Sequence, residues 1–225
     1  MISVESAQSL VIPVLRWHYW EGLPEGLPEL KSVDPLLRRR LSPQGRAALA
    51  VADIGAGDIG PVRVVYASQH GELTRTLGLI ESLRPESIDG PSPTSFALSV
   101  LNSTPGIYSI ARKDVSPSIA LSAGEESCWC GLLEAALTHL ELGQPVLLIS
   151  ADAQVPALLR HGVPDPAPIR ALAVLIAAGG KEYSLSQGEG LEESSSHALP
   201  SLAAALPEGG SWTRSRRAWR LESHA

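Results

Sequence analysis

The chain has 225 residues, of which 44% are hydrophobic and 19% charged, and its formal net charge is −6. This length is enough for one domain with its own core, so residues 1–225 are predicted to form a single domain. The acidic balance gives no electrostatic reason to bind nucleic acid or an anionic membrane surface.

Cysteine content and apolar runs indicate the compartment. The only cysteines, Cys128 and Cys130, are one residue apart, which is too close for an ordinary disulfide across a fold, so both are expected to be free. A C-x-C pair without a cluster of further Cys or His ligands predicts packing thiols, with no metal or cofactor. The longest apolar runs, such as 171–178, are too short for a membrane span, and no basic signal-peptide region precedes them. A cytoplasmic protein is therefore expected.

Strands and helices are predicted to alternate along most of the chain. Ser42-Pro43 is a strong helix start, because Ser is a good N-cap and proline is favoured at the first helical position. The Gly55-x-Gly57-x-x-Gly60 spacing follows a helix and precedes a strand, the reverse of the dinucleotide-binding order, so no nucleotide site is predicted. The predicted strands are 9–17, 62–67, 119–121, 146–149 and 170–177, and the predicted helices are 34–40, 43–51, 72–83, 94–102 and a run from Ser122 to Gly143.

The C-terminal part has a different composition. Segment 182–210 is rich in Ser, Glu and Gly, and is expected to be flexible apart from a short helix at 200–206. Segment 212–220 is basic and aromatic, and is predicted to be either a last strand or a docking arm.

The stretch 92–151 carries the strongest functional signal. A strand at 119–121 reaches a turn and then an apolar helix, which is how a nucleophile elbow is built. The helix N-terminus offers free N–H groups and the positive end of the helix dipole, which stabilise a thiolate or an oxyanion. An acyl-transfer elbow would carry Cys or Ser, whereas this one carries Glu125 and Glu126. The spacing Ser122-x-x-Glu125 also fits a capping box, so the structural alternative is a carboxylate that only caps the helix.

This order of residues resembles the nucleophile half of the β-ketoacyl synthases. In that family the seventh residue after Pro-Ser is the catalytic Cys; here the count from Pro117-Ser118 reaches Glu125, and Glu126 aligns almost as well. The resemblance extends in outline over 42–178 and implies an α/β fold, a thiolase-like half with a five-stranded mixed sheet covered by helices. The other matching pieces are Ser92-Pro93, Asn102, Gly106, strand 119–121 and Gly143.

Two departures from the family bear on activity. The nucleophile is replaced, and no His lies in a segment like the family's two catalytic His motifs; the sequence also stops where the second half would start. The pattern resembles the short, non-catalytic chain-length-factor-like proteins found beside synthases in aryl polyene and type II polyketide pathways. The resemblance implies a subunit that pairs with an active ketosynthase and shapes its acyl tunnel in polyene or fatty-acid-like biosynthesis.

The resemblance also implies tunnel residues. His70, in the segment VVYASQHGEL, aligns with a residue that points into the acyl tunnel near the dimer seam, which makes it a candidate gate on chain length. Ser95 and Phe96 come from a segment that lines the tunnel in the family. The alternative for His70 is an ordinary polar loop residue.

A partner surface is implied as well. In the family, the strand before the nucleophile pairs antiparallel with its twin across a dimer, and a free edge strand is a liability unless it is paired. A half-synthase also exposes the helix face that its missing half would cover. The expected partner is an active ketosynthase subunit or a second copy of this chain, with an acyl carrier protein as a further partner. The strand residues are Ser118, Ile119, Ala120, Leu121, Ser122 and Ala123.

Two other functions remain open. One is an active condensing enzyme or acyltransferase that uses Cys128, three positions beyond the expected nucleophile, or the Glu pair. The absence of a recognisable partner His speaks against it. The other is a homodimeric scaffold protein with no role in acyl chemistry.

Overall fold

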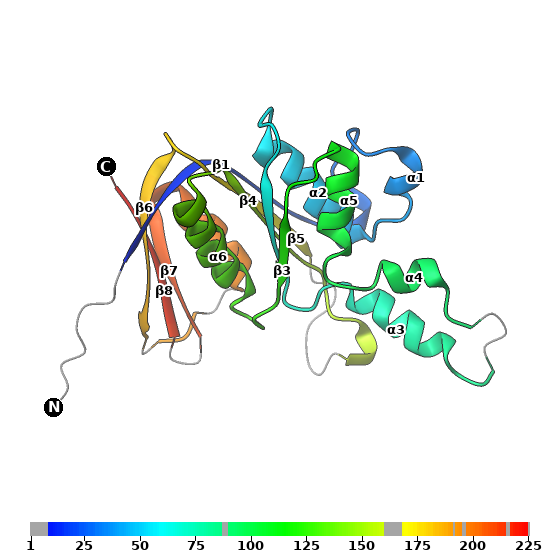
Figure 1. The fold of residues 1–225 in the computed structure, drawn as a ribbon. Coiled ribbons are helices and arrows are strands. Elements are labelled where there is room, and N and C mark those ends of the chain that lie inside the picture. The colour runs from blue at the N-terminus through cyan, green and yellow to red at the C-terminus, as the bar shows by residue number, and fades with distance from the viewer. Residues whose placement is uncertain are drawn as a thin grey trace.

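The computed structural model describes residues 9–86, 90–159, 168–190, 192–194, 197–214 and 217–224. Within these residues the strands form one mixed sheet in the order β3-β2-β4-β5-β1-β6-β8-β7 (Figure 1). The strands are β1 (Leu10–Gly22), β2 (Arg63–Ala67), β3 (Ser118–Leu121), β4 (Val146–Asp152), β5 (Ile169–Ile176), β6 (Lys181–Glu189), β7 (Gly209–Arg214) and β8 (Arg217–Ser223). The α-helices are α1 (Pro35–Arg38), α2 (Pro43–Ala56), α3 (Leu73–Ser82), α4 (Pro93–Ala97), α5 (Ser103–Arg112), α6 (Ser127–Leu142) and α7 (Ala198–Glu208), and the 3₁₀ helices are η1 (Pro24–Gly26) and η2 (Ala157–Leu159).

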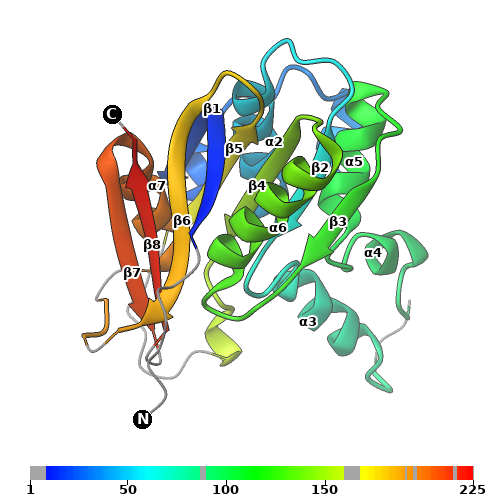
Figure 2. The ribbon, with the colours of Figure 1, turned by 60° about the vertical axis from the view of Figure 1, so that its left-hand side comes forward.

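The sheet has a parallel part and an antiparallel part. β3, β2 and β4 run parallel, and β5 is antiparallel to both of its neighbours, β4 and β1. Beyond β1 the sheet continues through β6, β8 and β7, which are antiparallel throughout and which we call the C-terminal wing (Figure 2). The α/β class is therefore confirmed, and the expected sheet corresponds to β1–β5. The predicted number of five strands is wrong, because the wing raises it to eight.

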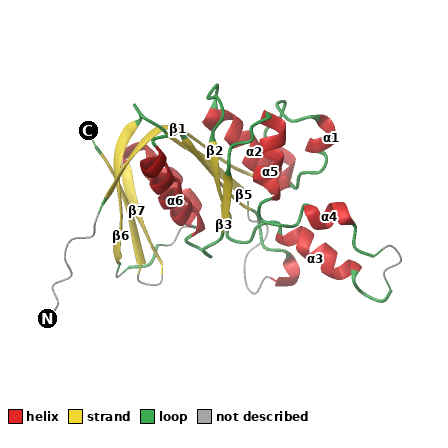
Figure 3. Ribbon diagram, viewed as in Figure 1, coloured by secondary structure: helices red, strands yellow, loops and turns green. Residues whose placement is uncertain are grey.

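Helices cover both faces of the sheet (Figure 3). α2 and α5 lie against one face, and α6 and α7 lie against the other. Along β4, Leu147 and Ile149 face the α2 side while Val146 and Leu148 face the α6 side, as the alternation of a strand requires. This burial on both faces explains why β4 is an unbroken apolar run in the sequence.

The start of α2 follows its sequence signal. Pro43 is the first helical residue, and the Ser42 Oγ accepts a hydrogen bond from the Gly45 N–H at 2.9 Å. Such a cap satisfies one of the four N–H groups that a helix start leaves without an intrahelical acceptor. The predicted helix at 43–51 is confirmed and extends to Ala56.

The predicted helix at 94–102 is only partly right. α4 ends at Ala97, and a separate helix, α5, begins at Ser103. No helix was predicted over the range of α5, which contains Pro105 and Gly106. Pro105 instead lies in the first turn of the helix, where its missing N–H would have had no intrahelical partner in any case.

The C-terminal segments complete the fold on the α6 face. The described residues of segment 212–220 lie in β7 and β8, which pair antiparallel and which we call the hairpin, so the strand interpretation is the right one. The helix predicted at 200–206 is the middle of α7, and segment 182–210 also contains β6. α7 and the hairpin pack on α6, so part of the face that was expected to stay uncovered is buried. Leu137 and Leu140 of α6 remain outside this contact and are 47% and 53% exposed.

Candidate functional site

β3 leads through a tight turn into α6, which is the predicted elbow. Gly124 has φ +58, a left-handed conformation that glycine adopts without strain. The Ser127 hydroxyl holds the turn, since it accepts from the Ala123 N–H at 2.9 Å and donates to the Gly124 carbonyl at 2.6 Å. The helix therefore begins at Ser127, later than the sequence predicted.

The predicted capping box is wrong. Ser122 donates its hydroxyl to the Gln69 carbonyl at 3.0 Å, five residues before the helix begins. Glu126 occupies the N-cap position, yet its side chain accepts no cap hydrogen bond from the backbone. Both elbow carboxylates are engaged by side chains of the C-terminal hairpin.

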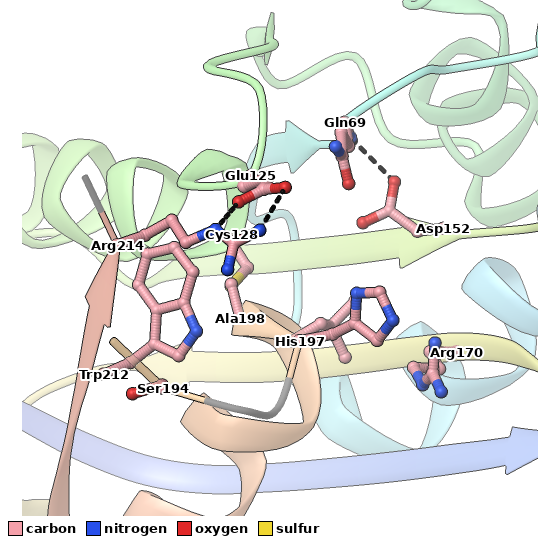
Figure 4. Close-up of a pocket in the computed structure, with 11 residues that line it drawn as sticks. Gln69, Glu125, Cys128, Asp152, Arg170, Ser194, His197, Ala198, Trp212 and Arg214 are labelled. Atoms are coloured by element: carbon pink, nitrogen blue, oxygen red, sulfur yellow. Dashed lines mark hydrogen bonds and ion pairs between the residues drawn. The ribbon is translucent and has the colours of Figure 1, made fainter. Parts of the chain in front are cut away.

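Glu125 pairs with Arg214 of β7. The carboxylate contacts the guanidinium through Arg214 Nε and through Nη2, the latter at 3.3 Å from Glu125 Oε1 (Figure 4). Arg214 also donates to Glu193 at 3.1 Å. Glu125 and Arg214 are 46% and 42% exposed, and exposed ion pairs contribute little to stability because water screens them.

Glu126 is held more deeply, by β8. Its side chain is 16% exposed, its Oε2 accepts from Trp219 Nε1 at 2.9 Å, and its Oε1 lies 3.4 Å from Arg217 Nη1. Trp219 also stacks on Trp129 of α6, with ring centroids 6.1 Å apart and planes at 16°. Sequence analysis missed these partners because 93 residues separate Glu126 from Trp219.

A small cavity of about 120 Å³ lies behind the elbow, and a second of about 200 Å³ shares five of its lining residues. Figure 4 shows that strands, α6 and the start of α7 all contribute side chains to it. The shared residues are Gln69, Glu125, Asp152, Arg170 and His197. No group of three or more His, Cys, Asp or Glu side chains among the described residues could hold a metal ion.

Asp152, at the end of β4, is the most buried charge of this cavity. Its Oδ1 accepts from Ser68 Oγ at 2.9 Å and from the Gln69 N–H at 2.7 Å. Burial raises the pKa of the Asp152 carboxyl, against the lowering effect of these two hydrogen bonds. Sequence analysis did not single out Asp152; the available signal was an acidic residue at the carboxyl end of a buried strand.

A family model described as the N-terminal domain of β-ketoacyl synthase matches residues 16–222. The chain belongs to this family. None of the curated proteins matches the sequence.

Solved structures of β-ketoacyl synthase relatives share the fold. A ketosynthase (ApeO) in complex with its chain length factor (ApeC) from Xenorhabdus doucetiae has a TM-score of 0.76 at 24% identity, over 95% of this chain and 99% of that chain. The ishigamide ketosynthase/chain length factor gives a TM-score of 0.57 at 14% identity, over 87% and 72%. A type II polyketide synthase acyl-carrier protein in complex with its ketosynthase (AntDE:AntF) gives 0.58 at 14%, over 81% and 70%. The thiolase-like fold of the β-ketoacyl synthases is thereby shown.

In this β-ketoacyl synthase domain, Cys128 is badly placed to act as a nucleophile. Its side chain is 2% exposed in the first turn of α6. Burial raises the pKa of the Cys128 thiol well above its ordinary value, and the negative charge of Asp152 raises it further. The thiolate is the reactive form, and this environment disfavours it. Burial also raises the pKa of Cys130.

The predicted tunnel residues of the synthase fold are not brought together. His70, in the turn between β2 and α3, lines the 200 Å³ cavity and also a larger cavity of about 660 Å³. Ser95 lies in α4, with its N–H directed to Ser92 Oγ at 3.4 Å, and Phe96 is 65% exposed. Neither Ser95 nor Phe96 lines these cavities.

The predicted partner strand forms one edge of the sheet. β3 pairs with β2 on one side, and no described strand pairs with its other side. Ser118 and Ile119 are exposed, while Ala120 and Leu121 are half-buried. Ser122 and Ala123 lie beyond the strand, in the exposed turn of the elbow.

Proposed function

We propose that this chain is a non-catalytic, chain-length-factor-like subunit that pairs with an active ketosynthase and shapes its acyl tunnel. The observation that carries the proposal is the state of the elbow: Glu125 and Glu126, where the sequence pattern predicts the nucleophile, bind the chain's own hairpin, while Cys128 is buried with a raised pKa. The ketosynthase and chain length factor complexes among the solved relatives support the choice of partner.

The setting follows from the same proposal. A subunit of this kind would work beside its synthase in the cytoplasm, in polyene or fatty-acid-like biosynthesis, and would meet an acyl carrier protein, as the ketosynthase in one solved relative does. No helix of the described residues is long and apolar enough to cross a membrane.

The proposed loss of the nucleophile can be tested directly. The isolated chain, incubated with acyl-CoA or acyl carrier substrates, is expected to keep its unmodified mass, because neither carboxylates in ion pairs nor a thiol of raised pKa attacks a thioester readily. Intact-mass spectrometry provides the measurement, with an active ketosynthase as the positive control. A stable acyl adduct on Cys128 or Cys130 would reject the non-catalytic assignment.

The free edge of β3 also supports a second candidate, a homodimeric scaffold, because the same strand could pair with a second copy. Light scattering of the chain alone and mixed with its ketosynthase separates the two. The proposed function requires a mixed complex, whereas the scaffold requires a stable homodimer that ignores the synthase.

His70 is proposed as a gate of the tunnel. It stands between the elbow cavities and the cavity of about 660 Å³, which falls in the size range of ligand sites and whose apolar lining includes Leu41, Leu73, Val155 and Ile169. An acyl chain that passes His70 would enter this larger space.

Changing the size of the gate residue should change product length. In the assembled pair, His70→Ala is expected to lengthen the products and His70→Trp to shorten them, because each buried methylene is worth about 0.8 kcal/mol and steric overlap forfeits it. Mass spectrometry of the products provides the measurement. His18→Ala, on β1 and away from these cavities, is the matched control. An unchanged product distribution in both His70 variants would reject His70 as the gate.

A further inference from the structure

The start of α6 is covered by the chain's own C-terminal hairpin. Trp212 of β7 and Trp219 of β8 are both 2% exposed and belong to the same buried cluster as Cys128 and Trp129. Trp212 and Arg214 also line the small cavity beside Cys128 (Figure 4). The hairpin therefore forms part of the cover over Cys128.

Two polar links join this hairpin to the elbow. One runs from Arg214 to Glu125, and the other from Trp219 and Arg217 to Glu126. Glu125 and Glu126 are adjacent, so one turn of backbone anchors both strands of the hairpin. The links come from the two residues that align with the family's nucleophile.

We propose that Glu125 and Glu126 form a latch that holds the β7–β8 hairpin over the start of α6 and keeps the elbow closed. The two carboxylates are then positioning residues. All of these contacts lie within one chain, so the latch can be tested without a partner or an acyl substrate.

The two carboxylates contribute unequally to the latch. Glu126 is 16% exposed and accepts a hydrogen bond at 2.9 Å from the indole N–H of the buried Trp219, whereas Glu125 is 46% exposed. Hydrogen bonds to charged groups strengthen as water is excluded, and exposed pairs contribute little. Removal of Glu126 should therefore open the hairpin more than removal of Glu125.

Thiol labelling measures the opening, because the chain has only two cysteines. Cys130 is partly accessible and should react with a maleimide in the folded protein, while Cys128 should be protected. In Glu126→Ala, the labelling rate of Cys128 is expected to rise about tenfold. This rise corresponds to a decrease of about 1.4 kcal/mol in the free energy of opening the hairpin. Peptide mass mapping after timed quenching assigns each label to its cysteine.

Three further variants make the test specific. Trp219→Phe keeps an aromatic ring against Trp129 but removes the indole N–H, and should raise Cys128 labelling as Glu126→Ala does. Glu125→Ala should raise it by less, under about fivefold. Glu141→Ala, at the exposed far end of α6, is the matched control and should leave the rate unchanged.

The decisive comparison is between variants whose far-UV circular dichroism matches the native protein. If Trp219→Phe and Glu126→Ala both fold and leave Cys128 as protected as in the native chain, the latch does not exist. If Glu126→Ala does not fold, Trp219→Phe alone decides in the same way. An equal rise in the Glu141→Ala control would also overturn the proposal, because the effect would then be a general loosening of α6.

Discussion

Replacing Ala120 with proline is expected to abolish association with a partner while the domain stays folded. The carbonyl of Pro117 accepts a hydrogen bond from the Val64 N–H of β2, and that of Leu121 accepts one from the Ser68 N–H just after β2, each at 3.3 Å. Because backbone groups alternate in direction along a strand, the N–H of Ala120 points to the open edge of the sheet. Proline removes this donor and places its ring in the path of an added strand. Light scattering of the mixture with a ketosynthase measures the loss.

The neighbouring position provides the control. The N–H of Ile119 faces β2, so Ile119→Pro should damage the fold itself, and its far-UV circular dichroism should change. Ala120→Pro should leave that spectrum unaltered. If Ala120→Pro still associates as the native chain does, β3 is not the contact strand, and another surface must carry the pairing.

Replacing Trp129 with alanine is expected to lower the free energy of unfolding by about 3–5 kcal/mol. Trp129 is fully buried between α6 and the wing and stacks on Trp219, so its removal leaves a large apolar cavity. The loss is a large part of the total stability of an ordinary domain. Urea unfolding followed by far-UV circular dichroism measures it.

Trp129→Phe separates packing from hydrogen bonding. The Trp129 Nε1 makes no hydrogen bond within the described residues, so phenylalanine gives up only ring area and should cost less than half as much as alanine. A cost for Trp129→Phe as large as that for Trp129→Ala would show that the indole N–H has a partner and that the ring is not the main source of stability.

Local signals in the sequence predicted the parts of the fold that depend on a few neighbouring residues. Ser42-Pro43 predicted the start of α2, and Gly143, with φ +63, ends α6 as predicted. These features arise from backbone groups that must be satisfied within one turn of helix, so their residue types are visible in a short window.

Long-range competition explains the errors. Ser122 and Glu125 have the spacing of a capping box, but neither side chain caps the helix. Ser122 bonds to the Gln69 carbonyl, Glu125 pairs with Arg214, and the helix starts later. β6 was not predicted, because its two buried apolar residues, Tyr183 and Leu185, alternate with polar residues in a Ser- and Glu-rich segment. The segment forms a strand because it pairs with β1 and β8. Propensity cannot show such partners, since they are brought together by tertiary structure.

The parts of the candidate site that could be predicted are those whose place in the sequence is set by the family's order of residues. The elbow and the place of His70 came from the order of residues along the chain, and Glu125 and His70 both line the cavity of about 200 Å³. The hydrogen bond between Glu126 and Trp219 of the hairpin joins positions 93 residues apart. The residue spacing of the synthase family does not predict this contact.

The stacked tryptophans also determine what optical methods can report. Three of the chain's five tryptophans, Trp129, Trp212 and Trp219, are buried around the start of α6, and the other two lie on β1. Intrinsic fluorescence therefore samples mainly the contact between α6 and the wing, and only Trp20 packs against the cluster on the α2 and α5 side of the sheet. A fluorescence transition that comes at lower denaturant than the far-UV transition would mean that the wing detaches before the remaining sheet melts, so that unfolding has at least two steps.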